Sequence, residues 1–195
     1  MTHNLRFNVV PRTARFLKNE MCYHVIARAS REVEVFAADA DYRFYCRLLK
    51  KYKERFGIHI FAFCLLPHDV HLVVHVKEAS RLSLFMQRVH QSYTAHFNKK
   101  YHKTGRLWRG RFKSVALDRD RDLFDCIKYV EFYPVRSELV HSPVEYPWSS
   151  CTFRISGQEN HLLNTTINHR DAVWPVSSSP QRPQKKKTRE VNHPY

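Results

Sequence analysis

The chain has 195 residues, of which 43% are hydrophobic and 13% aromatic, enough for one packed core and too many for a wholly disordered protein. Its 33 lysines and arginines outnumber 18 aspartates and glutamates, giving a formal net charge of +15 that favours a polyanionic partner such as nucleic acid, because each neutralised phosphate releases condensed counterions. No run approaches the ~20 apolar residues of a membrane-spanning helix, so membrane insertion is disfavoured. The five cysteines form no CxxC pair, which disfavours a zinc or disulfide framework. A cytoplasmic, nucleoid-associated location is therefore expected.

The first half of the chain predicts a strand, a helix and a hairpin. Residues 1–20 are basic and aperiodic, and they are expected to form an arm before a strand at 23–29. A helix follows with Asp39 or Asp41 as its cap and Gly57 as its stop. Its apolar positions have three-and-four spacing: Tyr45, Leu48, Leu49, Tyr52 and Phe56. The runs 58–66 and 70–76 are rich in β-branched and aromatic residues and predict two adjacent strands.

The second half predicts another helix, a strand and a third helix. Ser80 is expected to cap the second helix, whose apolar stripe consists of Leu82, Phe85, Met86, Val89, Tyr93 and Phe97. A strand at 111–117 and a helix at 120–132 follow. The order is that of an α+β, ferredoxin-like βαββαβ antiparallel sheet with two helices on one face, followed by an additional helix. The other sheet face is expected to stay free for a site.

Four segments are expected along the chain. The basic arm at 1–20 precedes a folded domain at 21–155. A C-terminal extension at 156–175 follows, and residues 176–195 are rich in Ser, Pro, Gln and Lys, which predicts a disordered basic tail.

Asp69 and His71 are the first candidate site residues. Because side chains alternate along a strand, both point to the same face of the predicted sheet. A carboxylate oxygen beside an imidazole nitrogen suits Mg²⁺ or Mn²⁺ better than a structural zinc site, which would need cysteines and four protein ligands. A capped, solvated turn is the alternative interpretation of the same residues.

Tyr129 is the second candidate, because it lies off the apolar stripe of the third predicted helix and can face a site. Its neighbours one turn away on the same face are Asp125 and Tyr133, which are expected to line that site. The alternative is an ordinary surface tyrosine on an amphipathic helix.

Taken together, five segments resemble the REP-associated tyrosine transposases of the HUH single-tyrosine superfamily over roughly residues 20–155. They are YHVIAR at 23–28, FCLLPHDVHLVV at 63–74, GRLWRGRFKS at 105–114, YVEFYPVR at 129–136 and YPWSS at 146–150. The last three resemble this family more than they resemble relaxases or replication initiators.

The resemblance implies a nuclease that binds single-stranded DNA hairpins, such as REP elements, and cleaves beside them. It implies that Tyr129 is the nucleophile and forms a 5′-phosphotyrosine intermediate, with Asp69 and His71 at the positions of the paired ligands for Mg²⁺ or Mn²⁺. A phenol with a pKa of about 10 is a weak nucleophile at neutral pH, so a cation on the phosphate is expected to assist. A monomer is favoured, with a dimer as the alternative.

Two positions depart from the family pattern. The family has a histidine where this chain has Asp69, and a polar amide where it has Tyr133. A neutral phenol is a poor ligand, so the site is expected to keep two protein ligands plus water unless Asp125 contributes. These departures leave a second hypothesis open beside the transposase, that of a catalytically impaired descendant acting as a DNA-binding or regulatory module.

A basic loop and strand are the expected DNA-binding element, because cations there alternate with an aromatic side chain. The residues are Arg106, Trp108, Arg109, Arg111 and Lys113. The alternative is a solvated loop in which Trp108 anchors the core. An RNA-binding basic protein is a third hypothesis, which explains the charge but not Tyr129.

Overall fold

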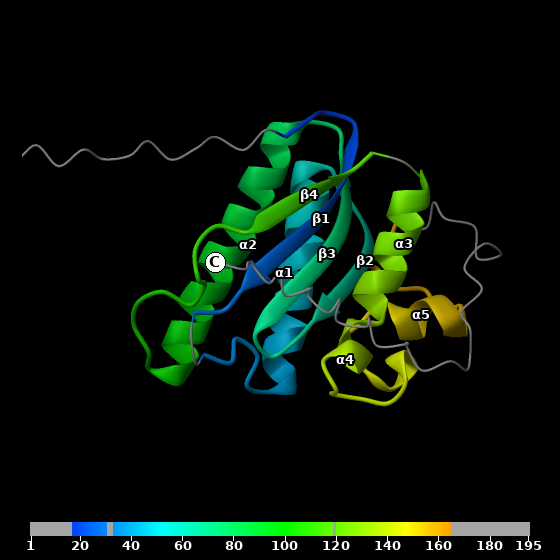
Figure 1. Cartoon of the computed structure of the whole chain (residues 1–195). Helices are drawn as coiled ribbons and strands as arrows, with labels where there is room; N and C mark the ends of the chain where they lie inside the picture. Colours follow the sequence, from blue (N-terminus) through cyan, green and yellow to red (C-terminus); the bar gives the residue numbers. More distant parts are fainter. Residues whose placement is uncertain (1–16, 31–32, 119, 165–195) are drawn as a thin grey trace, which may run out of the picture.

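The computed structural model describes residues 17–30, 33–118 and 120–164 (Figure 1). Most of the expected basic arm and all of the expected tail at 176–195 lie outside these residues, and the expected extension at 156–175 is described as far as 164. Within the described ranges, no helix is long and apolar enough to cross a membrane.

Four antiparallel strands form one sheet in the order β2-β3-β1-β4. Their bounds are Met21–Arg28 for β1, Ile58–Leu65 for β2, Asp69–Val76 for β3 and Lys113–Leu117 for β4. The chain leaves β1, crosses through a helix to β2, turns back as β3 into the gap between them, and crosses through a second helix to β4. This is the expected ferredoxin-like topology.

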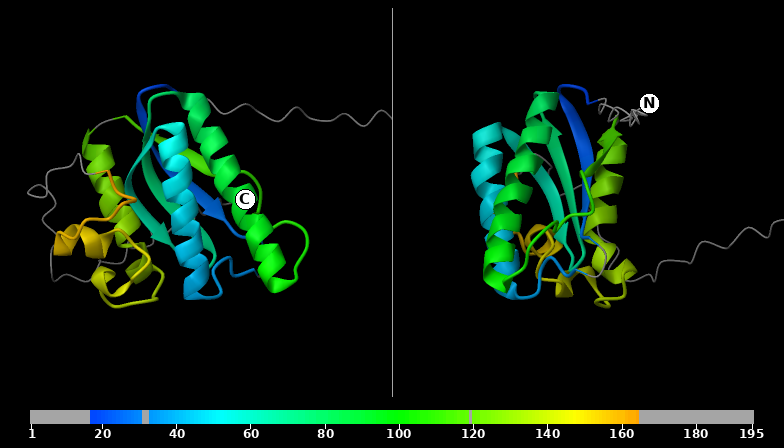
Figure 2. Two further views of the ribbon diagram at one scale, coloured as in Figure 1. Left: turned by 180° about the vertical axis from the view of Figure 1, so that it is seen from behind. Right: turned by 90° about the vertical axis from the view of Figure 1, so that its left-hand side faces the viewer.

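Helices α1 (Asp39–Phe56) and α2 (Ala79–Tyr101) cover one face of the sheet (Figure 2). Alternate strand residues such as Val25 and Leu72 meet the apolar stripes of both helices in the main core. The first expected cap is wrong in detail: Ala38 is the N-cap residue of α1, while the Asp41 carboxylate accepts hydrogen bonds from the Ala37 and Ala38 N–H groups at 3.1 and 3.0 Å. A carboxylate three residues into a helix can reach back to orphan donors in this way.

The expected Ser80 cap is also wrong, because α2 begins two residues earlier. Its N-cap residue is Glu78, which has an extended backbone and makes no capping hydrogen bond with its side chain. Instead, the Glu78 carboxylate pairs with Arg81 at 3.0 Å, and the first helical N–H, that of Ala79, is satisfied by Asn19 Oδ1 at 2.9 Å. A residue distant in sequence thus takes the role that local spacing assigns to Ser80.

Helix α3 (Asp120–Glu131) packs on the opposite face, and Figure 2 shows the three layers edge-on. Ile127 and Val130 bury against Ala62, Cys64 and Val73 in a second, smaller core. The sequence predicted that this face stays free, and this prediction is wrong in part, because α3 covers the β2 and β3 side. The β1 and β4 side stays open, and Val115 on β4 is 55% exposed.

The YPWSS segment at 146–150 closes the outer edge of β2. The backbone of Leu65 donates to Trp148 O, that of Ser150 donates to Phe63 O, and the Tyr146 hydroxyl donates to Leu65 O at 2.7 Å. An unpaired edge strand can pair with another chain and aggregate. The segment at 146–150, one of the five that carry the family resemblance, therefore has a structural role. Around it lie three short helices that the sequence did not predict: α4 (Tyr133–Arg136), η1 (Pro143–Glu145) and α5 (Cys151–Ser156).

Candidate active site and nucleic-acid interface

The floor of the candidate site is the sheet face beneath α3, where β1 and β3 bring four polar side chains together. Antiparallel pairing sets Arg28 opposite Asp69 and Ile26 opposite His71. Two residues along β1, His24 shares this face, and its Nε2 lies 3.1 Å from His71 Nδ1. Sequence reasoning missed His24 because its neighbour on β3 is set by strand register, which is a property of the whole fold.

The two histidines form a buried neutral pair. His24 is 8% exposed and His71 is 1% exposed. Burial lowers the pKa of His24 to about 4, and burial together with nearby positive charge lowers the pKa of His71 to about 3. Both rings are therefore uncharged at pH 7, and one of them donates the single N–H between Nε2 and Nδ1 while the other accepts it.

Asp69 sits at the edge of this floor and is half-buried. Arg28 Nε lies 3.4 Å from its Oδ1. Burial raises the pKa of the Asp69 carboxyl, and the charges of Arg28 and His68 partly offset that rise. The preceding residue, His68, turns away from the site, with Nδ1 3.0 Å from Val33 O.

Helices α3 and α4 bring two tyrosines and an arginine over the histidine pair. Tyr129 remains 39% exposed, and its ring meets the His24 ring edge-on at 5.8 Å between centroids. Tyr133 lies against His71 at 4.2 Å. Arg136 Cζ is 4.1 Å from the centroid of the Tyr129 ring. The residues predicted as nucleophile, ligand and site-lining tyrosine are thus brought into one cluster, to which Arg136 is a new member.

Asp125 is the predicted site residue that does not join this cluster. Its Oδ2 lies 3.8 Å from Arg121 Nε, and both side chains point into solvent, at 66% and 88% exposure. Helix α3 turns its Asp125 flank outward because Ile127 and Val130 must face the sheet.

The donor set fits a cation that keeps most of its water. His71 Nε2 is buried and has no hydrogen-bond partner, which leaves one imidazole nitrogen ready to ligate while Nδ1 is held by His24. Asp69 adds a carboxylate on the same strand face. In the described parts of the chain, no group of three His, Cys, Asp or Glu side chains could hold a metal. Two protein ligands plus water is an arrangement that Mg²⁺ tolerates.

The basic loop between α2 and β4 has a buried part and an exposed part. Trp108 is 7% exposed and stacks on His90 at 4.2 Å with an interplanar angle of 14°. Arg109 and Arg111 are exposed on either side of Gly110. Trp108 therefore occupies the position of a core anchor, and its ring is not presented to an incoming base.

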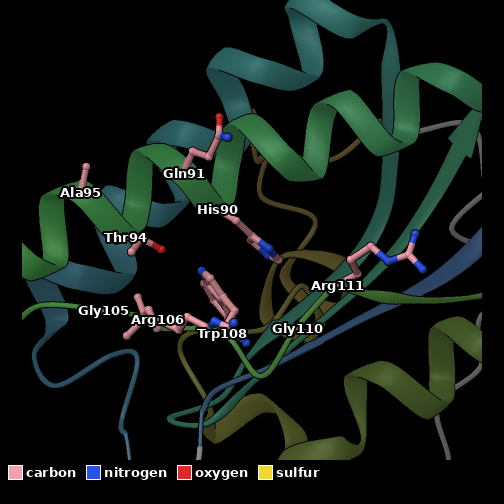
Figure 3. Close-up of a pocket in the computed structure, with 10 residues that line it drawn as sticks. His90, Gln91, Thr94, Ala95, Gly105, Arg106, Trp108, Gly110 and Arg111 are labelled. Carbon is pink, nitrogen blue, oxygen red and sulfur yellow. The ribbon is translucent and has the colours of Figure 1, made fainter. Parts of the chain in front are cut away.

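A cavity of about 770 Å³ separates this loop from α2 (Figure 3). Arg106 and Arg111 stand on its loop side, and Gln91 and Thr94 on its helix side. Beneath it, Trp108 Nε1 and His90 Nε2 are buried without hydrogen-bond partners. Lys113 faces away from this cavity because, on β4, it pairs with Ile26 and shares its sheet face.

Comparison with known proteins gives concordant matches. Residues 18–132 match the model of a family described as transposase, IS200 like. A protein of Haemophilus influenzae that bears the name REP-associated tyrosine transposase is 27% identical over 108 residues, which cover 50% of this chain and 61% of that protein. A solved structure described as a REP-associated tyrosine transposase bound to a REP hairpin superposes with a TM-score of 0.60 at 15% identity, covering 87% of this chain and 100% of the other. The structural match shows a shared fold.

Proposed function

The chain belongs to the family of IS200-like transposases, and we propose that it binds single-stranded DNA hairpins, then cleaves and rejoins the strand beside them through a 5′-phosphotyrosine on Tyr129. The resemblance to REP-associated tyrosine transposases predicted from five sequence segments is confirmed at the level of the family. The match spans only about three fifths of the H. influenzae relative. The proposed activity is therefore argued from the geometry of the candidate site.

The observation that carries the proposal is the position of Tyr129. It is an exposed tyrosine on a helix that Ile127 and Val130 anchor in a buried core. Its ring lies between an uncharged histidine below, at 5.8 Å, and the guanidinium of Arg136 at 4.1 Å. An accessible phenol beside fixed positive charge is the arrangement that nucleophilic attack on a phosphodiester needs.

The reaction is a pair of reversible displacements. The Tyr129 oxygen attacks the phosphorus atom and loses its proton, a new P–O(Tyr) bond forms, and the P–O3′ bond breaks so that the 3′ oxygen leaves as a hydroxyl. The segment downstream of the break stays on the enzyme, joined through its 5′ phosphate as a phosphotyrosine ester. Because the ester retains the energy of the broken bond, a 3′ hydroxyl can attack it and reseal a strand without ATP.

Arg136 and the histidine pair divide the supporting roles. Arg136, whose guanidinium lies 4.1 Å from the centre of the Tyr129 ring, would supply permanent positive charge to the negative charge that develops on the attacking and phosphate oxygens. His24 holds His71 through the 3.1 Å contact, which fixes the ring so that Nε2 is the free nitrogen. Asp69 and His71 would hold Mg²⁺ or Mn²⁺, which when bound supplies positive charge to the scissile phosphate.

Two further observations support DNA as the partner. Arg106, Arg109 and Arg111 lie in the exposed part of the loop, near the open half of the sheet face. The solved structure that shares the fold is bound to a REP hairpin, and REP-like hairpins are the first substrates to test.

A second function is favoured by the contacts of Asp69 and Tyr133. The carboxylate is engaged by Arg28 at 3.4 Å, and the Tyr133 ring covers His71 at 4.2 Å. Both contacts compete with a cation for its ligands. The alternative is a hairpin-binding module that has lost cleavage and acts as a DNA-binding or regulatory protein.

The test is covalent adduct formation. The protein is incubated with labelled hairpins from its genomic neighbourhood and with a REP hairpin, in Mn²⁺ or Mg²⁺, and a denaturant-resistant protein–DNA species is sought. Tyr129→Phe is expected to abolish the adduct and leave both the fold and hairpin affinity intact, because only an exposed hydroxyl is lost. Binding without an adduct in either metal supports the second function, and an adduct that persists in Tyr129→Phe excludes this nucleophile.

A further inference from the structure

Beside the candidate active site lies a second cavity, of about 370 Å³, whose lining is almost entirely cationic. It is formed by Ile26, Arg28, Arg109, Gly110, Arg111 and Lys113. Four of these six side chains are positively charged at neutral pH, and none is acidic. Like charges gathered around one small space repel one another, and an anion that enters the space relieves that repulsion.

A break in strand pairing builds this cavity. Ile26 pairs with Lys113, so an unbroken ladder would set Ala29 opposite Gly110. Ala29 instead bridges to Trp108, and two extra residues are therefore accommodated on the β4 side. Gly110 has φ +135°, a backbone conformation that L side chains rarely adopt. The bulge turns the loop outward and leaves the cavity between it and β1.

The walls of the cavity are held firmly on both sides. The N–H of Arg109 donates to Arg28 O at 2.9 Å, and the N–H of Ser30 donates to Leu107 O at 2.8 Å. The neighbouring Trp108 is locked in the core by His90. The side chains of the cavity thus project from a fixed backbone, which reduces the ordering cost of binding a ligand.

The cavity opens on the same sheet face as the nucleophile. Ile26 pairs with His71 on one side and with Lys113 on the other, so these three side chains form one row across three strands. Directly paired side chains on one face are roughly 5 Å apart. Arg28 links the two sites, because it lines the cavity and lies 3.4 Å from Asp69.

Resting on the proposed function, we infer that this cavity binds a backbone phosphate of the DNA strand that neighbours the phosphate attacked by Tyr129. The volume suits a phosphate with its sugar and is too small for a duplex. The ligands are cations and a glycine backbone, which recognise charge and do not read base edges. The site therefore fixes where the strand lies relative to Tyr129, whatever its sequence.

The test pairs a protein change with a single neutralised phosphate. Hairpins with a single-stranded flank carry one uncharged methylphosphonate at each position in turn, and binding is measured in the Tyr129→Phe background so that no adduct forms. One position near the hairpin foot is expected to lower affinity roughly three- to tenfold. In Lys113→Gln, a methylphosphonate at that DNA position is expected to lower affinity no further, while the other DNA positions behave as before. Lys51→Gln, an exposed change on α1 across the sheet, is the control and is expected to keep the loss of affinity at that position.

The possible results distinguish phosphate binding in the cavity from the proposed cleavage at Tyr129. If Lys113→Gln and Arg109→Gln both keep full sensitivity at every position, the cavity is not a phosphate site, even when wild type forms the adduct. If the coupling appears but wild type forms no adduct in Mn²⁺ or Mg²⁺, the cavity stands and the proposed cleavage fails. A thermal melt of each variant confirms folding, which is expected because Lys113 is exposed.

Discussion

At the scale of single residues, the candidate site is defined by which nitrogen and oxygen atoms have partners. His71 Nδ1 is held by His24 and its Nε2 is not held by any group. The Asp69 carboxylate is shared with Arg28. A cation bound by Asp69 and His71 would therefore displace two contacts, that of Asp69 with Arg28 and that of the Tyr133 ring with His71.

Replacing these two residues with the family's own types is expected to increase cleavage. Asp69→His removes the competing pair with Arg28 and restores a second imidazole, and Tyr133→Asn removes the ring from His71 and adds an amide oxygen. The two changes serve one site, so their combined effect is expected to exceed the sum of the single effects. The measurement is the initial rate of adduct formation across a Mn²⁺ titration. Unchanged rates in the double variant would show that the departures do not limit cleavage.

A half-buried histidine outside the site makes stability depend on pH. Burial lowers the pKa of His90 from 6.5 to about 3, so as pH falls below 6.5 the unfolded chain binds a proton that the folded chain refuses. Stability is therefore lost progressively from pH 6.5 downward. His90→Phe is expected to reduce the loss between pH 7 and pH 5 by about 1–2 kcal/mol, measured by urea unfolding.

The exposed His141→Phe is the matched control for this measurement and is expected to leave the pH profile unchanged. His24 and His71 also have lowered pKa values, so part of the dependence remains in His90→Phe. An identical profile in wild type and His90→Phe would show that the ring titrates normally and that the cavity beside Trp108 admits water to it.

At the scale of elements, short-range pattern predicted the long helices from their apolar stripes, and it predicted β2 and β3 from continuous apolar runs that are buried on both faces of the sheet. Gly57, with φ +62°, ends α1 as expected. The pattern could not predict α4 or α5, which are only 4 and 6 residues long and are held by tertiary contacts. Trp108 illustrates the same limit. Arginines lie near it in sequence at 106 and 109, but its partners are His90, Tyr45 and Tyr93, brought from two helices.

Arg154 is expected to be the most sensitive position in the C-terminal elements. It donates through Nε to the fully buried Glu131 at 3.0 Å and through Nη2 to Phe61 O at 2.6 Å, joining α5, α3 and β2. Arg154→Ala leaves a buried carboxylate with only the Ser150 hydroxyl. The expected loss in unfolding free energy is about 3–5 kcal/mol.

Two controls define the origin of that loss, with urea unfolding as the measurement. Arg121→Ala breaks the exposed pair with Asp125 on α3, the helix that carries Glu131. It is expected to lower the free energy of unfolding by under about 0.5 kcal/mol. Replacing Glu131 and Arg154 together with leucine is expected to recover much of the loss, because no buried charge remains. A double variant as unstable as Arg154→Ala would attribute the effect to packing instead.

At the scale of the whole molecule, the fold gives the two sides of the sheet different tasks. One side carries the main core under α1 and α2, which are the elements that composition and periodicity predict well. The other side is split between α3, which positions Tyr129, and an open half bordered by cationic side chains. The sequence predicted Tyr129, Asp69 and His71 as site residues, but not His24, Arg28 or Arg136, because strand register and the α3–α4 turn bring these three to the site.

This division predicts where the net charge acts on DNA. If Arg109 and Arg111 contact phosphates on the open side, neutralising both should lower the salt dependence of single-strand binding by about 1.4, since each contact contributes about 0.7 to the slope of log K against log salt. Arg43 and Arg47 carry the same charge on α1, across the sheet, and their double glutamine variant should leave the slope nearly unchanged. The measurement is a salt titration of affinity for a hairpin with a single-stranded flank. Equal slopes in the two double variants would mean that charge acts through the net field of the molecule, and DNA binding would then have to be assigned to another surface.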